Sequence, residues 1–211
     1  MLKEIIPDVQ EALDLGISIF AGETEENRLD QVLVDASRGE LQPIYDYMDD
    51  LPDLTAQPTP ILPSENIQRT AGSHSSCDLG RGCPFQCSFC TIINVHGRKS
   101  RFRTADDLEK IIRENYAQGI NRFFITDDNF ARNKDWESFL DRIIEVRSKE
   151  GWRIKFTIQV DTLCHRIKNF VAKCGKAGVN HVFIGLENIN PDNLIAAQKK
   201  QNRIVEYREM I

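Results

Sequence analysis

The sequence predicts an α/β fold built on a parallel sheet, because short apolar segments alternate with amphipathic helices through its C-terminal part. Apolar residues recur at helical spacing after Thr104, after Lys134 and after Leu163, and each of these runs ends at a glycine. Strands that are joined in this way by helices run parallel to one another, with right-handed crossovers.

Four strands are expected in this part of the chain, at 74–79, 122–126, 153–160 and 180–186. Helices are expected at 104–118, 134–149 and 163–177, and another follows Pro191. The residues expected to face the core are Leu108, Ile111, Ile112 and Tyr116 in the first helix, Trp136, Phe139, Leu140, Ile143 and Ile144 in the second, and Ile167, Phe170, Val171 and Cys174 in the third.

The N-terminal part, residues 1–48, is expected to be a small strand–helix piece that is too short to bury a core alone. A short helical segment at 8–13, a strand at 16–20 and a helix at 27–37 follow one another, and the last carries an apolar stripe at Leu29, Val32, Leu33 and Ala36. Four prolines then fall between positions 52 and 63, which predicts a linker at 49–70 and a main domain at 71–211.

Composition is that of a soluble globular protein, with 211 residues, 41% hydrophobic and 28% charged. A net charge of −5 gives no electrostatic footprint for nucleic acid, and no apolar run is long enough to span a bilayer. Because the sequence has no secretory signal, we expect a reducing, cytoplasmic location. One basic cluster, Arg98, Lys99, Arg101 and Arg103, is either a solvated loop or a patch that faces an anionic substrate or cofactor.

Three cysteines, Cys83, Cys87 and Cys90, stand at C-x3-C-x2-C spacing in one loop, so that their thiolates can share one metal centre. A single zinc ion prefers four protein ligands, and the sequence has no second C-x-x-C pair, although His96 is a candidate fourth ligand. A [4Fe–4S] cube held by three thiolates instead leaves one iron open to a small molecule. The remaining cysteines, Cys77, Cys164 and Cys174, are expected to be buried and inert.

Polar residues stand where each of the later strands ends, and the carboxyl ends of parallel barrel strands meet at one active-site face. They are Asp127, Asp128 and Asn129 after the second strand, Gln159 and Asp161 at the third, and Glu187 and Asn188 at the fourth. We expect these side chains to share a pocket with the cysteine loop. The alternative is that each of them merely ends a strand or caps a helix.

The cysteine spacing, with Phe89 directly before the last cysteine, resembles the radical S-adenosylmethionine (SAM) superfamily. The resemblance covers about 71–211 and implies a partial barrel of six βα units, of which four are present before the chain stops. It implies that Cys83, Cys87 and Cys90 hold a [4Fe–4S] cluster whose open iron chelates SAM. In the family the cluster donates one electron and splits SAM into methionine and a 5′-deoxyadenosyl radical. A reductant such as flavodoxin or ferredoxin is then a partner, together with a substrate that the resemblance does not identify.

The sequence departs from the family at one motif, because Thr126–Asn129 stands where Gly-Gly-Glu commonly binds the SAM amino group. In this departure the sequence resembles the subgroup of the family that carries an N-terminal cobalamin-binding domain. The Gly-Leu-Glu of 185–187 resembles the motif of that subgroup beside the SAM ribose and carboxylate, where Glu187 would accept hydrogen bonds from hydroxyl groups. The residues that the resemblance assigns to cofactor binding are Phe89, Asp127, Asp128, Asn129, Gln159, Asp161 and Glu187.

The N-terminal piece also resembles the end of this Rossmann-like cobalamin-binding domain, through Gly-Glu-Thr-Glu at 22–25 and Asp-Asp-Leu-Pro at 49–52. The cobalt-binding motif D-x-H-x-x-G is absent, so that cobalamin is an association only. We therefore expect part of a radical SAM enzyme that performs methylation, rearrangement or another C–H functionalisation. The alternative is a zinc or iron–sulfur module that only binds.

Overall fold

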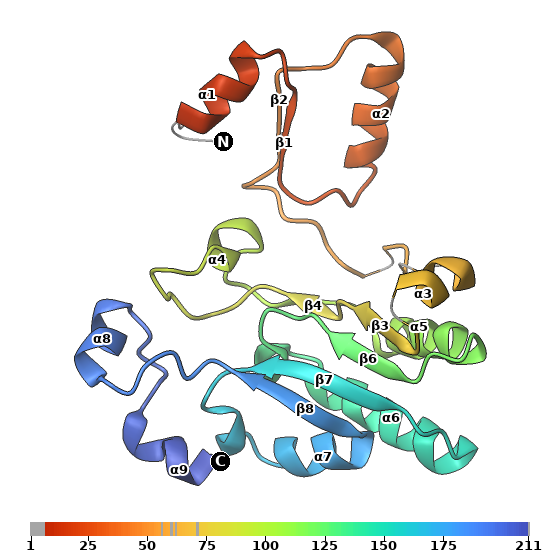
Figure 1. The fold of residues 1–211 in the computed structure, drawn as a ribbon, viewed down its shortest axis with the longest axis vertical. Helices are drawn as coiled ribbons and strands as arrows, with labels where there is room; N and C mark the ends of the chain where they lie inside the picture. The colour runs from red at the N-terminus through yellow and green to blue at the C-terminus, as the bar shows by residue number, and fades with distance from the viewer. Residues whose placement is uncertain (1–6, 56, 60, 62, 71, 211) are drawn as a thin grey trace.

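The computed structural model describes residues 7–210 except 56, 60, 62 and 71. The N-terminal piece contains α1 (Pro7–Asp14), β1 (Ile19–Ala21), α2 (Arg28–Arg38) and β2 (Ile44–Asp46). Strands β1 and β2 pair in parallel, and Figure 1 shows them apart from the main sheet, flanked by α1 and α2. The sequence did not predict β2, because three residues are too few to show a strand period.

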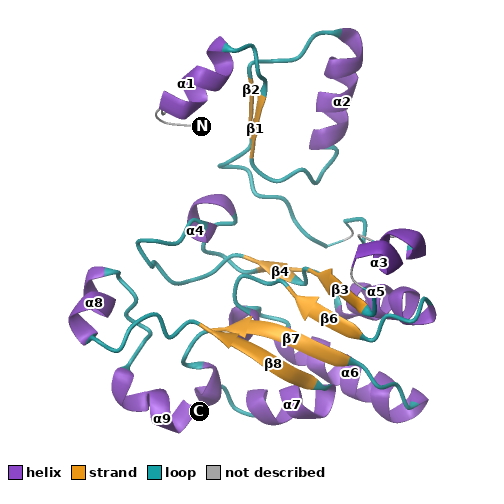
Figure 2. Ribbon diagram, viewed as in Figure 1, coloured by secondary structure: helices purple, strands orange, loops and turns teal. Residues whose placement is uncertain are grey.

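The main sheet has four parallel strands in the order β3-β6-β7-β8. Their bounds are β3 (His74–Cys77), β6 (Arg122–Ile125), β7 (Lys155–Val160) and β8 (Val179–Ile184). The crossover helices α5 (Ala105–Ala117), α6 (Trp136–Glu150) and α7 (Phe170–Ala177) lie along one side of the sheet (Figure 2). The predicted α/β fold with a parallel sheet is confirmed.

The core forms between this sheet and its helices. Alternate residues of β7, from Phe156 to Val160, are buried, and the ring of Phe156 lies 5.7 Å from that of Phe123 on β6. The predicted faces of α5 and α6 pack against them, as two examples show: Leu108 and Phe139 are both fully buried. The prediction that Val171 faces the core is wrong, since its side chain is 59% exposed. Helix α7 begins at Phe170, and Phe170 takes the core position instead.

The helix predicted at 163–177 is interrupted. A 3-10 turn, η2 (Cys164–Arg166), comes first, and Asn169 adopts a left-handed conformation with φ 64° before α7 begins. Asparagine tolerates this conformation better than most residues, which explains why the break falls there. A similar 3-10 turn, η1 (Phe130–Arg132), precedes α6 and delays its start to Trp136.

Described parts of the predicted linker contain more structure than its prolines indicate. Helix α3 (Ser64–Thr70) occupies its last seven residues, and the side chain of Leu54 is fully buried. In the N-terminal piece, by contrast, the predicted apolar stripe of α2 is largely exposed: Leu29 is 46% and Leu33 58% exposed.

The remaining elements are short. A two-residue antiparallel hairpin, β4 (Gly80–Arg81) with β5 (Arg101–Phe102), encloses α4 (Ile92–Val95). After the sheet come α8 (Pro191–Ala196), η3 (Ile204–Glu206) and α9 (Tyr207–Met210). Within the described part of the chain, none of the helices has the length and apolar character to cross a membrane.

Candidate functional site

The hairpin β4–β5 frames the cysteine loop. Arg81 lies opposite Arg101 in this hairpin. The loop that carries the three cysteines therefore begins and ends at the same point of the fold. Directly before the first cysteine, Gly82 has φ +94°, and a Cβ atom there would lie 2.4 Å from the carbonyl oxygen of Lys99. Only glycine fits this close approach. The loop closes on itself through a hydrogen bond of 3.2 Å from the Cys83 amide to the Gly97 carbonyl.

A cavity of about 340 Å³ brings the cysteine loop and the strand ends together. All of the predicted site residues except Asp127 line it, namely Cys83, Cys87, Phe89, Cys90, Asp128, Asn129, Gln159, Asp161 and Glu187. The three cysteines are free thiols, with Cys87 buried and the other two half-buried. Burial raises the pKa of the Cys83 thiol, whereas a coordinated metal would deprotonate it.

A polar network forms one wall of this cavity. Arg132 donates two parallel hydrogen bonds to Asp161, of 2.6 and 2.7 Å, and Asn129 donates a third of 3.0 Å. The bidentate pair fixes the carboxylate plane. The Oδ1 atom of Asn129 is buried and accepts no hydrogen bond within the described structure, so a buried acceptor remains beside the cavity.

Asp127 lies outside the cavity and is 1% exposed. One carboxylate oxygen accepts hydrogen bonds from the backbone amides of Leu79 and Gly80, at 2.7 and 2.9 Å, and the other accepts one of 2.8 Å from Asn133. Burial raises the pKa of Asp127 to about 7. The side chain therefore ties the end of β6 to the start of β4, where the cysteine loop begins.

Asp128 points the other way and lines the cavity. Its carboxylate accepts hydrogen bonds from the Gly82 amide at 2.7 Å and pairs with Nδ1 of His96 at 2.9 Å. The hydrogen bond with Asp128 raises the pKa of His96. His96, the candidate fourth zinc ligand, is thus engaged elsewhere, and among the described residues no three His, Cys, Asp or Glu side chains converge as the ligands of a single ion would.

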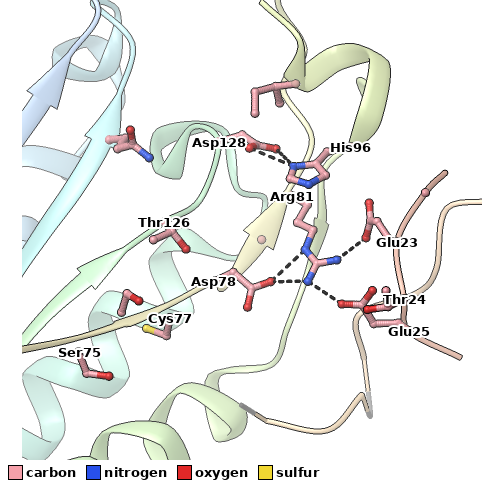
Figure 3. A pocket seen from close by; sticks show the side chains of 15 residues that line it. Glu23, Thr24, Glu25, Ser75, Cys77, Asp78, Arg81, His96, Thr126 and Asp128 are labelled. Atoms are coloured by element: carbon pink, nitrogen blue, oxygen red, sulfur yellow. Dashed lines mark hydrogen bonds and ion pairs between the residues drawn. The ribbon is translucent and has the colours of Figure 1, made fainter. Parts of the chain in front are cut away.

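A second, larger cavity of about 810 Å³ lies where the N-terminal piece meets the sheet. Figure 3 shows Glu23, Thr24 and Glu25 on one side of it and Ser75, Cys77 and Thr126 on the other. Asp128 and Gln159 line this cavity as well as the first, so the two cavities adjoin.

Ion pairs hold the N-terminal piece against the hairpin. Glu23 is 5% exposed and accepts hydrogen bonds from both Arg81 and Arg101. Arg81 also pairs with Glu25 at 2.6 Å (Figure 3). Arg103 is 2% exposed and donates to a linker carbonyl at 3.2 Å. Neither interpretation of the basic cluster therefore holds for Arg101 and Arg103, because both are internal structural cations.

A further segment contacts the cysteine loop, and it was not predicted from the sequence. It follows α8 and comprises residues 197–202. Lys199 pairs with Glu187 at 2.6 Å and lies 5.6 Å from the ring centre of Phe89. Gln201 donates a hydrogen bond of 3.4 Å to the sulfur of Cys87. The run carries no motif, and only the fold brings it to the loop.

The other cysteines do not line the cavity that contains the cysteine loop, although Cys77 lines the larger one. Cys77, Cys164 and Cys174 are buried free thiols in the hydrophobic core, as predicted. Burial raises the pKa of Cys174 to about 12, which keeps it a neutral thiol at physiological pH.

Comparison with known proteins identifies the family. The family described as "Radical SAM superfamily" matches residues 78–211, and the chain therefore belongs to the radical SAM superfamily. An uncharacterized methyltransferase from Synechocystis is 31% identical over 156 residues, which are 72% of this chain and 28% of that protein. Bacteriochlorophyllide d C-12(1)-methyltransferase from Chlorobaculum tepidum is 28% identical over 200 residues, 92% of this chain and 42% of that protein. The chain thus spans less than half the length of these relatives.

Solved structures show the same fold. The radical SAM methyltransferase TsrM from Kitasatospora setae, with tryptophan and a SAM analogue bound, has a TM-score of 0.58 at 19% identity, covering 70% of this chain and 29% of that one. The cobalamin-dependent SAM radical enzyme OxsB, with aqua-cobalamin and SAM bound, has a TM-score of 0.56 at 17% identity, covering 94% of this chain and 40% of that one.

Proposed function

We propose that this chain is the part of a radical SAM methyltransferase that binds the cluster and SAM. The observation that carries this proposal is the common cavity: three free thiols from one loop and polar side chains from three strand ends line the same space. A cofactor that combines a soft metal site with hydrogen-bonding groups fits such a combination.

The residues present fit a [4Fe–4S] cluster and SAM. Cys83, Cys87 and Cys90 would hold the cube, which offers a separate iron to each thiolate, so that the three sulfurs need not meet at one point. Gln201 already places an N–H donor on the Cys87 sulfur, and the unpartnered acceptor of Asn129 suits the amino group of SAM. When bound, the cluster supplies the single electron that splits SAM.

The chain itself positions SAM through charge and hydrogen bonds. Three polar side chains are available for this: Asp128 and Gln159 line both cavities, and Asp161 lines the first. They would accept hydrogen bonds from the amino and hydroxyl groups of SAM. Glu187 would face the ribose, and Phe89 would cover the cofactor on the side where Lys199 lies. Asp127 acts on the site through the cysteine loop that it holds.

Methyl transfer is the reaction class that we propose, since the two curated relatives described above carry the names of methyltransferases. We propose cobalamin as the occupant of the larger cavity, because it adjoins the first and is bounded by the N-terminal piece. Side-chain hydroxyls of Ser75, Ser76 and Thr126 line it and would hydrogen-bond amide groups of such a ligand.

The division of the chain is part of this proposal. Residues 1–48 form the end of a cobalamin-binding domain, 49–70 the linker and 71–211 the radical SAM core. The separate pairing of β1 with β2 and the start of the family match at residue 78 support it. A cytoplasmic one-electron donor such as flavodoxin or ferredoxin would reduce the cluster.

Anaerobic reconstitution of the chain with iron and sulfide tests the proposal. We expect a brown protein with about four irons that cleaves SAM under a strong reductant. Cys83→Ala, Cys87→Ala and Cys90→Ala should each lose the cluster, whereas Cys174→Ala is the matched control and should keep its iron. A colourless zinc protein, or equal iron loss from a folded Cys174→Ala variant, would contradict the assignment.

A further inference from the structure

We infer that Gln201 is a positioning residue that raises the reduction potential of the cluster through its hydrogen bond to the Cys87 sulfur. The inference rests on the proposed function, in which Cys87 holds an iron. It assigns a role to a residue of the segment after α8, which has no sequence motif and lies more than one hundred positions from the cysteine loop.

The contact is buried on both sides. Gln201 is 8% exposed and Cys87 is 7% exposed, and the Nε2 atom of the amide lies 3.4 Å from the sulfur. A metal-bound thiolate accepts hydrogen bonds and donates none, so it is the NH₂ end of the amide that faces it. Because both groups are buried, the dipole of this N–H group acts on the sulfur in a medium of lower dielectric constant than water.

The fold holds the segment that carries Gln201 in place from several directions. The Ser88 amide, next to Cys87, donates a hydrogen bond of 3.0 Å to the Ala197 carbonyl, which fixes the segment to the cysteine loop itself. The Thr162 hydroxyl donates a hydrogen bond of 3.2 Å to the Gln201 carbonyl. Asn202 donates to the Gly185 carbonyl at 2.8 Å. The backbone segment that carries Gln201 is therefore attached to the cysteine loop, to the end of β7 and to the end of β8.

The electrostatic consequence has a definite sign. Reduction adds one negative charge to the cluster, and part of that charge resides on the cysteine sulfurs. A fixed N–H dipole that points at one sulfur stabilises the reduced state more than the oxidised state, and hydrogen bonds to sulfur are among the factors that set cluster potentials. Removal of the donor should therefore make the cluster harder to reduce.

Redox titration of the reconstituted chain, followed by electron paramagnetic resonance, tests this. In Gln201→Leu, which keeps the size but removes the donor, we expect unchanged iron content and an about tenfold lower ratio of reduced to oxidised cluster at a fixed potential, or about 59 mV for one electron. Gln86→Leu is the matched control, because Gln86 is exposed and precedes Cys87 directly, and its potential should equal that of the unaltered chain.

A second variant keeps the test decisive if Gln201→Leu loses its iron. Gln201→Met keeps the length of the side chain and has no hydrogen-bond donor, so it should lower the potential by about as much as Gln201→Leu. Potentials equal to that of the unaltered chain in an iron-replete Gln201→Leu or Gln201→Met protein would overturn the inference alone. Failure of the unaltered chain to assemble any cluster would instead overturn the proposed function.

Discussion

Replacement of Asp127 by alanine should destabilise the chain, and by an amount that depends on pH. The substitution leaves three buried donors without an acceptor, the amides of Leu79 and Gly80 and the side chain of Asn133. Each such donor costs about 1–3 kcal/mol, and water that enters the space left by the carboxyl group recovers part of this cost. We therefore expect a loss of about 3 kcal/mol at pH 5.

The pH dependence follows from the raised pKa of Asp127. Burial brings it from 3.8 to about 7 in the folded chain, so the folded state holds the proton more tightly than the unfolded state. The stability that Asp127 contributes is therefore complete below pH 3.8 and is lost as the pH rises through 7. Between pH 5 and pH 8 the advantage of the unaltered chain over Asp127→Ala should fall by about 2–3 kcal/mol.

Urea unfolding at both pH values measures this difference directly. Asp107→Ala is the matched control, because Asp107 carries the same side chain in an exposed capping box and its loss should cost about 1 kcal/mol. A cost for Asp127→Ala below about 1 kcal/mol at pH 5, or a cost that does not change with pH, would refute the structural role of this carboxyl group.

Three further results are expected. Glu187→Ala should weaken SAM binding to the reconstituted chain by about 1.5–3 kcal/mol in calorimetry while iron content stays constant. Unchanged affinity would show that Glu187 only pairs with Lys199 and does not bind SAM. Asp128→Asn should lower the pKa of His96 in a nuclear magnetic resonance titration, because the Asp128 carboxylate raises it now; the pair stabilises the fold below pH 6.5 and loses this effect as the pH rises through the folded pKa of His96. Glu23→Ala should cost about 1–3 kcal/mol in urea unfolding, since Arg81 and Arg101 each lose a charged partner while Arg81 keeps Glu25 and Arg101 keeps the Pro52 carbonyl; a neutral result would show that the Glu23 ion pairs do not hold the N-terminal piece.

The location of the site was predictable because its parts are either local in sequence or fixed by the fold class. The cysteines share one loop, and no tertiary information is needed to bring them together. Gln159 and Glu187 are far apart in sequence, but both close a parallel strand, and the carboxyl ends of such strands meet at one edge. That rule placed them in the same cavity as Cys87.

The rule does not say which neighbour at a strand end faces the cavity. Successive side chains of an extended segment point to opposite sides, so one residue of register decides between Asp127 and Asp128. Asp128 lines both cavities, whereas Asp127 is turned into the protein and binds the start of β4. The sequence shows two adjacent aspartates and nothing that distinguishes them.

Contacts between distant segments could not be predicted from the sequence either. Arg101 looked like one member of an exposed basic cluster, yet its partner is Glu23, 78 positions away. Gln201 reaches Cys87 across 114 positions. No local period or motif encodes either contact, because both depend on how complete elements pack against one another.

The central claim is that the cluster held by Cys83, Cys87 and Cys90 binds SAM at an open iron in the cavity at the strand ends. The most direct measurement is the electron paramagnetic resonance spectrum of the reduced, reconstituted chain before and after addition of SAM. We predict that SAM changes the spectrum of the unaltered chain. A reduced cluster whose spectrum stays the same at saturating SAM would contradict the claim.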